Sequence, residues 1–401
     1  MTVIEKGVCA PTGFRAAAAA AGIKRLGTTR LDCALIVSDA PAAVAGVFTT
    51  NVVHAAPVRY CREVCAGGVA RAVVVNSGNA NACTGEQGYA DTLATATLVG
   101  KLLDIPVDQV CVSSTGVIGV PMPMDRLTHG IEQCATALSD RNGTDAARAI
   151  MTTDTIPKEC SIAIPLEAGC VRVGAIAKGA GMIAPHMATM LSFITTDAAV
   201  AAPDLQRLLQ DAVSKSFNCI CVDNDMSTND TVLCLANGLS GVSLKPGTPD
   251  YERFAAAVTE ICVSLAQALV RDGEGATKFI EITVAGAAND EDARRIASAI
   301  AKSQLCKTAF YGQDANWGRI AAAAGYSGAA FDPTGLDLHI QGVHVLAAGQ
   351  PTSYTEAEVQ ALMKEPDIKV SLSLREGTAA ATFWTSDLSL DYVKINADYR
   401  T

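Results

Sequence analysis

The sequence predicts an α/β protein of the α+β kind, in which mixed sheets and helices pack in layers. Short segments rich in β-branched residues are interspersed with segments whose apolar residues recur every three or four positions. The strand-like segments crowd together between residues 161 and 197, which favours a mixed or antiparallel sheet over regular strand–helix alternation. The chain has 401 residues, 49% hydrophobic and 18% charged, so it is long and apolar enough to bury a large core.

The individual elements follow from these two periodicities. Strands are expected at residues 72–76, 110–114, 161–165, 171–177, 190–195, 231–235, 278–284 and 369–374. Helices are expected around residues 89–103, 124–138, 205–213, 254–269 and 296–300. The last seventy residues are mainly strand-like. Asp314, Asn316 and Arg319 are equally consistent with a supporting shell around a binding site and with an N-capped helix that continues into Ile320 and a run of alanines.

Composition narrows the class of function. The net charge is −10 and no Lys/Arg cluster contains interleaved aromatic residues, which argues against a nucleic-acid or anionic-membrane partner and favours small-molecule substrates. No run of 18 uncharged apolar residues and no signal-peptide pattern occur, so we expect a cytoplasmic protein without a transmembrane span. The 14 cysteines lack a Cys-x-x-Cys pair and are expected to be reduced and mostly buried, and the five histidines lack metal-ligand spacing, so no metal site is expected.

The most informative segment is Lys-Gly-Ala-Gly-Met-Ile-Ala-Pro-His-Met-Ala-Thr-Met-Leu, residues 178–191. It places the hydroxyl of Thr189 directly after the small residue Ala188 and directly before an apolar strand. The glycines at 179 and 181 permit unusual backbone angles and close approaches, and Pro185 disfavours a helix. If the chain cleaves itself at Ala188–Thr189, the new terminus carries both a nucleophile and a base, because an α-amino group titrates at ~7.7–8.0.

Other interpretations of this segment remain. Residues 179–184 match the dinucleotide fingerprint G-x-G-x-x-A after a strand-like run, with Asp197 further on, but Pro185 interrupts the helix that the fingerprint requires. An inert glycine-rich turn between two strands is the other alternative. His186 lies three residues before Thr189, yet nearness in an extended segment does not ensure hydrogen-bond reach, so we do not assign it as a base.

A second segment whose residues suit catalysis is Cys-Val-Ser-Ser-Thr-Gly-Val-Ile-Gly, residues 111–119, in which a strand enters a glycine-containing turn. Such a turn can direct backbone N–H groups and a hydroxyl at one point, as an oxyanion hole requires. In isolation, a plain turn at the end of a strand is the simpler interpretation.

Residues 178–191 resemble the autoproteolysis segment of the ornithine acetyltransferase family, also called the bifunctional glutamate N-acetyltransferase and amino-acid acetyltransferase family. The similarity extends over nearly the whole chain. It includes residues 10–15 (Ala-Pro-Thr-Gly-Phe-Arg), the Asn/Gly-rich residues 76–88, and residues 151–155, 274–278 and 312–319. Agreement at so many separate places indicates membership of this family.

The resemblance implies a self-cleaving fold with an N-terminal threonine nucleophile. Residues 1–188 would form an α chain carrying the oxyanion loop, and residues 189–401 a β chain carrying Thr189 and the C-terminal substrate-binding region. It implies acetyl transfer from N2-acetyl-L-ornithine to L-glutamate in arginine biosynthesis, through an acetyl-Thr189 intermediate, without a cofactor. It leaves open whether acetyl-CoA also serves as an acetyl donor. Family members assemble as two α and two β chains.

By the same resemblance, Thr115 and Gly116 form the oxyanion hole, and the substrate is contacted by Thr152, Lys178, Thr189, Glu274, Asn396 and Thr401. Thr155 is an alternative to Thr152, because both belong to one short run. Charge suggests that Lys178 pairs with a substrate carboxylate and Glu274 with an ammonium or amide N–H. Two other functions are kept as alternatives: an N-terminal-nucleophile aminopeptidase or amidohydrolase, which passes the acyl group to water, and a non-catalytic small-molecule-binding protein.

Overall fold

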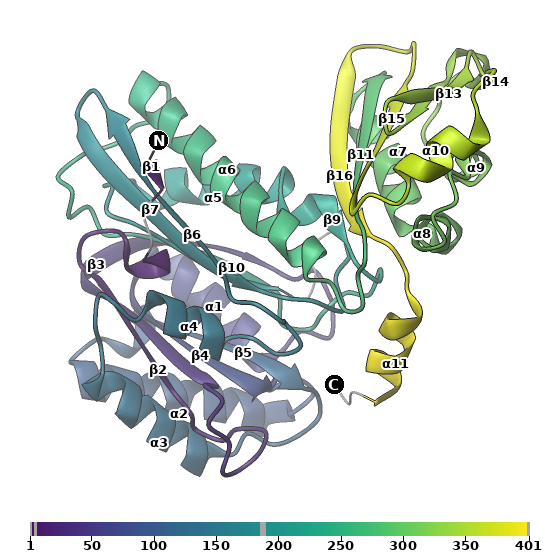
Figure 1. Ribbon diagram of the computed structural model, residues 1–401. Coiled ribbons are helices and arrows are strands. Elements are labelled where there is room, and N and C mark those ends of the chain that lie inside the picture. Colours follow the sequence, from purple (N-terminus) through teal and green to yellow (C-terminus); the bar gives the residue numbers. More distant parts are fainter. Residues whose placement is uncertain (1, 4–5, 185–189, 399–401) are drawn as a thin grey trace.

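Two β-sheets organise the chain (Figure 1). The computed structural model describes residues 2–3, 6–184 and 190–398. Within these residues the larger sheet has nine strands in the order β1-β6-β7-β8-β10-β3-β4-β5, with β2 paired to β3. Its strands are β1 (Thr2–Val3), β2 (Phe14–Ala19), β3 (Cys33–Phe48), β4 (Val69–Asn79), β5 (Val110–Val117), β6 (Lys158–Leu166), β7 (Gly169–Lys178), β8 (Leu191–Thr196) and β10 (Thr231–Ala236).

The smaller sheet has seven strands within the described residues, in the order β14-β13-β12-β15-β11-β16-β9. These are β9 (Ile220–Cys221), β11 (Phe279–Ala287), β12 (Asp337–Ile340), β13 (Val343–Ala347), β14 (Gln350–Pro351), β15 (Asp367–Ser373) and β16 (Ala379–Ser386). The helices are α1 (Ala56–Gly67), α2 (Gly85–Leu103), α3 (Met124–Thr136), α4 (Gly143–Ala149), α5 (Ala202–Ser214), α6 (Pro249–Arg271), α7 (Asp290–Lys302), α8 (Gln304–Tyr311), α9 (Trp317–Gly325), α10 (Glu356–Leu362) and α11 (Leu390–Asp398).

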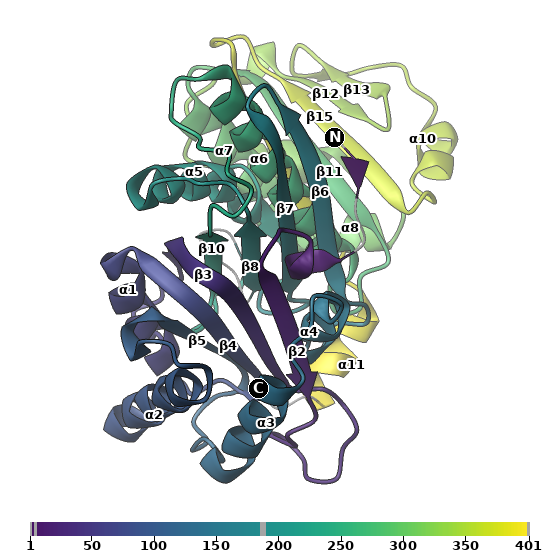
Figure 2. The same cartoon turned by 90° about the vertical axis from the view of Figure 1, so that its left-hand side faces the viewer.

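Helices cover both faces of the large sheet. Figures 1 and 2 show α1, α2 and α3 together on one side, and α5 and α6 on the other side, toward the smaller sheet. Side chains of successive residues point to opposite faces of a strand. In β8, Phe193 therefore joins the core under α1–α4, while Ile194 joins the core that continues through α5 and α6 into the smaller sheet.

The most important topological feature is the position of β8 and β10. Both strands come from the second half of the sequence, yet they lie between β7 and β3 from the first half. β8 pairs antiparallel with β7, with Lys178 opposite Leu191, and parallel with β10, with Thr231 opposite Leu191. A chain divided between residues 188 and 189 would therefore still share one continuous sheet.

The expected elements are confirmed, and others were not anticipated. Every strand and helix predicted from periodicity is present, β6–β7–β8 are antiparallel as expected, and the Asn316 side chain caps α9 by accepting the Arg319 N–H at 3.3 Å. The sequence did not reveal β2, whose alanines favour a helix in isolation but pair with β3 here. The C-terminal region is mainly strand-like as expected, with β12–β16, and its described part also contains helices α10 and α11.

Two further expectations concern burial. All 14 cysteines, which fall in described parts of the chain, are free thiols, and most of them are buried. Helix α6 has the length and mean hydropathy (1.4) of a membrane span. Half of that apolar window is buried, because α6 packs against β6 and β7 as a core helix.

Candidate active site

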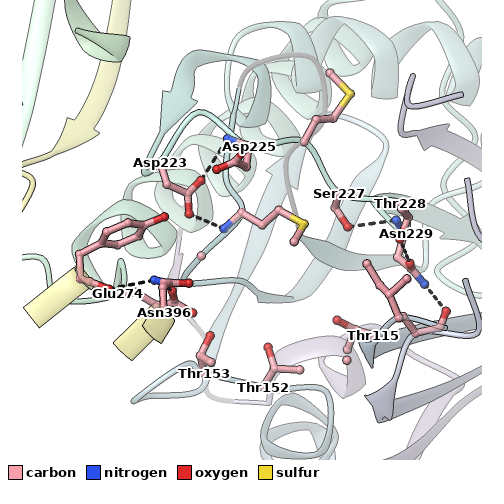
Figure 3. A pocket seen from close by; sticks show the side chains of 17 residues that line it. Thr115, Thr152, Thr153, Asp223, Asp225, Ser227, Thr228, Asn229, Glu274 and Asn396 are labelled. Atoms are coloured by element: carbon pink, nitrogen blue, oxygen red, sulfur yellow. Dashed lines mark hydrogen bonds between the residues drawn. The ribbon is translucent and has the colours of Figure 1, made fainter. Parts of the chain in front are cut away.

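A pocket of about 230 Å³ lies where the end of β5, the turn after β7 and helix α11 meet. Figure 3 shows polar side chains from these separate parts of the chain arranged around it. This volume is below the ~300–1,000 Å³ typical of sites for drug-sized ligands, so it suits a ligand of amino-acid size. The lining residues are Ala80, Thr115, Gly116, Ile118, Thr152, Thr153, Gly181, Met182, Asp223, Asp225, Met226, Ser227, Thr228, Asn229, Glu274, Tyr392 and Asn396.

The Thr115–Gly116 pair lines one wall of the pocket. Gly116 has φ +132°, and a Cβ there would collide with the backbone of Gly78 on the neighbouring strand β4. Only glycine fits this position. The Asn229 amide donates hydrogen bonds to the carbonyl oxygens of Ser114 (2.8 Å) and Ala80 (2.6 Å), which fixes the two strand ends beside each other. The segment is therefore a bulged strand end held by these hydrogen bonds, and not the plain turn that was the alternative interpretation.

Lys178 connects two of the predicted site residues. Its ammonium donates to the hydroxyl of Thr152 at 2.7 Å and lies 3.4 Å from the hydroxyl of Thr115. The Lys178 side chain is 1% exposed, and this burial lowers its pKa, against the opposing effect of Asp154. The Lys178 ammonium is therefore held next to the hydroxyl groups of Thr115 and Thr152, two residues that line the pocket.

A buried ion-pair network anchors the start of the glycine-rich segment. Asp154 accepts the Lys158 ammonium (2.7 Å) and the Gly179 N–H (2.6 Å), and the same ammonium reaches Asp272 at 2.5 Å. Burial disfavours the Asp154 carboxylate, but Lys178 and Lys158 outweigh this and lower its pKa to about 2. The backbone N–H and the hydroxyl of Thr155 also bind Asp272.

This arrangement separates Thr152 from Thr155. Thr152 lines the pocket and accepts a hydrogen bond from Lys178, whereas Thr155 belongs to the Asp272 network and does not line the pocket. The geometry therefore favours Thr152 over Thr155 as the residue able to contact a ligand.

Glu274 and Asn396 close the opposite side of the pocket. The Asn396 Nδ2 donates to Glu274 Oε2 at 2.8 Å, which ties helix α11 to the turn before β11. A Cβ on Gly181 would collide with the Glu274 carboxylate, so the close approach expected at this glycine is confirmed. Figure 3 places Glu274 and Asn396 across the pocket from Thr115.

Asp223 and Tyr392 were not identified from the sequence. Asp223 accepts the backbone N–H groups of Met182 (2.5 Å) and Ile183 (2.7 Å), which shapes the chain after Gly181. Burial raises the pKa of Asp223 to about 6, against these hydrogen bonds, and its side chain interacts with the Tyr392 hydroxyl. The run Asp-Asn-Asp-Met-Ser-Thr-Asn-Asp, residues 223–230, signals a polar loop, but only the tertiary structure brings it to the pocket.

Three predicted residues, Ala188, Thr189 and Thr401, lie outside the described residues. The nearest described residue after the predicted junction is Met190, which leads into β8.

The dinucleotide interpretation is wrong, because residues 179–184 follow β7 without forming a helix, and Asp197 binds the backbone N–H groups of Thr12 and Arg172. Among residues 2–3, 6–184 and 190–398, no three His, Cys, Asp or Glu side chains are grouped to hold a metal ion.

Comparison with known proteins identifies the family of the chain. The ArgJ family model matches residues 15–401. The Arginine biosynthesis bifunctional protein ArgJ of Symbiobacterium thermophilum is 51% identical to this chain over 402 residues, which cover 100% of both chains. The protein of the same name from Geobacter sulfurreducens is 51% identical over 392 residues, which cover 97% of this chain and 99% of the relative. The crystal structure of the argJ protein from Bacillus halodurans is 46% identical, with a TM-score of 0.52, and aligns over 53% of this chain and 100% of that one. These matches confirm the family predicted from the sequence: the chain belongs to the ArgJ family.

Proposed function

We propose that this protein transfers the acetyl group of N2-acetyl-L-ornithine to L-glutamate through an acetyl ester on Thr189. Membership of the ArgJ family makes the chain an acetyltransferase of arginine biosynthesis. The observation that carries the specific proposal is the convergence of Thr115, Gly116, Thr152, Glu274 and Asn396 on one pocket of amino-acid size. These residues come from segments far apart in the sequence, and each was predicted to belong to the site.

Activation of the enzyme begins with self-cleavage. The Thr189 hydroxyl attacks the Ala188 carbonyl carbon, the Ala188–Thr189 amide becomes an ester, and water hydrolyses that ester. The product is an α chain, residues 1–188, and a β chain, residues 189–401, whose first residue carries a free α-amino group.

Two observations support this maturation. Strands β8 and β10 lie between β7 and β3, so the two chains would remain held in one sheet after cleavage. The Bacillus halodurans chain aligns over its whole length with 53% of this chain, and residues 189–401 make up that same share of the 401 residues.

In the transfer reaction, the α-amino group of Thr189 removes the proton of its own hydroxyl, which attacks the acetyl carbonyl of acetylornithine. The developing oxyanion is stabilised by Thr115 and Gly116, and ornithine leaves with a proton. Glutamate then attacks the acetyl ester and regenerates the Thr189 hydroxyl. No cofactor takes part, and acetyl-CoA is a candidate second acetyl donor.

Each remaining residue has a distinct role. Lys178 holds the hydroxyls of Thr115 and Thr152 in position. Its positive charge lies next to this wall of the pocket, which would face a substrate carboxylate. Glu274 and Asn396 form the opposite wall and bind the ammonium and amide groups of the substrate, and Thr401 completes the substrate contacts. We place the reaction in the cytoplasm and infer an assembly of two α and two β chains.

The decisive experiment separates transfer from hydrolysis and from simple binding. Purified protein is mixed with acetylornithine, with and without glutamate, and both ornithine and acetylglutamate are quantified. We expect ornithine and acetylglutamate in equal amounts when glutamate is present. Release of acetate at a rate that glutamate does not change would indicate a hydrolase, and binding without any product would indicate a non-catalytic protein.

A further inference from the structure

A second cavity, of about 620 Å³, lies where helix α7 faces the connection between α5 and β9 and the end of α9. We call it the α7 cavity. Among the described residues, none lines both this cavity and the active-site pocket. Phe383 of β16, which is 2% exposed, contributes an apolar part of the lining. The volume lies within the ~300–1,000 Å³ typical of small-molecule sites, so the α7 cavity has room for a ligand of nucleotide size.

The α7 cavity is basic, although the chain as a whole carries a net charge of −10. Arg294, Ser298 and Lys302 follow one another at intervals of four residues, so they lie on one face of α7. Arg295 also lines the cavity, but it donates to the Glu291 carboxylate at 3.0 Å, and this pair is neutral as a whole. The positive charges of Arg294 and Lys302 remain. A cleft lined by one sign of charge concentrates ligands of the opposite sign, so the ligand expected here is an anion.

The charged groups of Arg294 and Lys302 are open to a ligand. Both residues are half-buried, and within residues 2–3, 6–184 and 190–398 neither forms a hydrogen bond or an ion pair. Burial raises the pKa of the Cys219 thiol to about 11, and the positive charge of Arg294 opposes this effect. Cys219 directly follows Asn218, which lines the cavity. The Arg294 guanidinium is therefore directed towards the α5–β9 connection.

Hydroxyl groups accompany these charges. Ser303 and Ser327 each accept a backbone N–H at 3.3 Å, from Cys306 and Ala329, and no acceptor for either hydroxyl proton occurs in the part of the chain that the structure describes. The Ser298 hydroxyl likewise has no partner among the described residues. A phosphate group has several acceptor oxygens, and Arg and Lys bind it through charge-assisted hydrogen bonds. The cavity thus combines the cations and the hydroxyl donors that a phosphate group requires.

Tyr326 adds an aromatic surface to the lining. It follows the end of α9 and is 64% exposed, so its ring is open to stack on a planar base. We propose that the α7 cavity binds a phosphorylated small molecule of nucleotide type, with Arg294 and Lys302 holding its phosphate groups and Tyr326 its base. The site is separate from the active-site pocket, so this inference does not depend on the proposed acetyl transfer.

The first test measures the chemical class of the ligand. Purified wild-type protein is titrated by calorimetry with ADP, inorganic pyrophosphate, adenosine and citrate, at low ionic strength and without metal ions. We expect ADP and pyrophosphate to bind and adenosine, which lacks phosphate, to show no binding. Citrate carries its negative charge on carboxylates and should bind more weakly than pyrophosphate. Acetylornithine should not displace ADP, because the two ligands occupy different cavities.

The second test compares variants on one helix. Arg294→Gln and Lys302→Gln should each weaken ADP binding by about 10- to 100-fold, because each removes a charge-assisted hydrogen bond. Arg295→Gln is the matched control. It removes the same charge from the same helix, but its guanidinium already pairs with Glu291, so ADP affinity should change at most about twofold. Tyr326→Ala should weaken the binding of ADP and leave that of pyrophosphate unchanged. All four variants should retain the thermal midpoint and the transferase activity of the wild type, since they replace partly exposed side chains outside the active-site pocket.

Comparison of ADP with coenzyme A, which carries an additional phosphate on its ribose, distinguishes two sources of the phosphate group. Tighter binding of coenzyme A would assign the cavity to a coenzyme, and equal or tighter binding of ADP would assign it to a free nucleotide. The proposal is overturned if the wild type binds neither ADP nor pyrophosphate, if citrate binds as tightly as pyrophosphate, or if Arg294→Gln and Arg295→Gln lose equal affinity. Displacement of ADP by acetylornithine would also overturn it, because the nucleotide would then occupy the active-site pocket. Absence of acetyl transfer would instead refute the proposed function alone.

Discussion

The Asn396 side chain donates a 2.8 Å hydrogen bond to the Glu274 carboxylate, 122 positions away in the sequence. This bond fastens the C-terminal helix α11 to the wall of the pocket, although α11 itself buries no residue. Helix α11 therefore contributes Tyr392 and Asn396 to the pocket lining.

The first prediction concerns this contact. Asn396→Ala, or deletion of residues 396–401, should lower kcat/KM for acetylornithine by about 10- to 100-fold, mainly through KM, because a hydrogen bond to a charged group contributes ~1.5–3 kcal/mol. Folding and self-cleavage should be unaffected. Lys394→Ala is the matched control, because Lys394 lies on the same helix but pairs with Asp391. Unchanged steady-state kinetics in the truncated enzyme would remove Asn396 and Thr401 from the site.

The second prediction concerns maturation. Wild-type protein should run as two fragments on a denaturing gel, with masses that correspond to residues 1–188 and 189–401. Thr189→Ala should run as one chain, because alanine has no hydroxyl to attack the Ala188 carbonyl. An intact wild-type chain that is fully active would contradict the mechanism.

The third prediction concerns the covalent intermediate. Acetylornithine without glutamate should release a burst of ornithine equal to the number of active sites and leave one acetyl group on Thr189. Peptide mass spectrometry locates the acetyl group, and initial rates with both substrates should show ping-pong kinetics. Sequential kinetics with no acetylated peptide would favour direct transfer between the two substrates.

The fourth prediction concerns the oxyanion hole. Thr115→Ala should slow turnover by about 10²–10³, while the affinity for acetylornithine changes little. Turnover must be measured per cleaved molecule, because self-cleavage also passes through a tetrahedral intermediate. Ser113→Ala is the control, since this buried hydroxyl on the same strand does not line the pocket and has no partner among the described residues. Equal rates for the two variants would exclude Thr115.

The fifth prediction concerns the buried ion pairs. Asp154→Asn should destabilise the protein by about 3–5 kcal/mol in chemical denaturation, because it leaves the Lys158 and Lys178 ammonium groups with fewer partners.

The pH dependence of stability provides a second measurement of the same contact. The pKa of Asp154 in the folded state, about 2, lies below its value in the unfolded chain. Its stabilising contribution is therefore present above ~pH 4 and is lost as pH falls toward 2. The wild type should lose this stability on acidification and the variant should not. Asp140→Asn, which removes a surface pair with Lys6, should have no measurable effect.

The sequence by itself determined the family, the position of the predicted junction and the main secondary structure. These properties are encoded locally, in the residue types of segment 178–191 and in the apolar periodicity of strands such as β7 and β8. The sequence also indicated the need for glycine at 181, because a glycine in such a turn permits an unusual backbone angle or a close approach, and the structure shows the close approach to Glu274.

Only the tertiary structure decided which groups act together. Thr152 is distinguished from Thr155 by contacts with Lys178 and Asp272. Complete burial raises the pKa of the Asp230 carboxyl, which lies beside Met190. The alanines of β2 form a strand because β3 offers hydrogen bonds that no local preference records. Charge states and strand partners depend on what distant segments place around a residue, and a linear pattern does not contain that information.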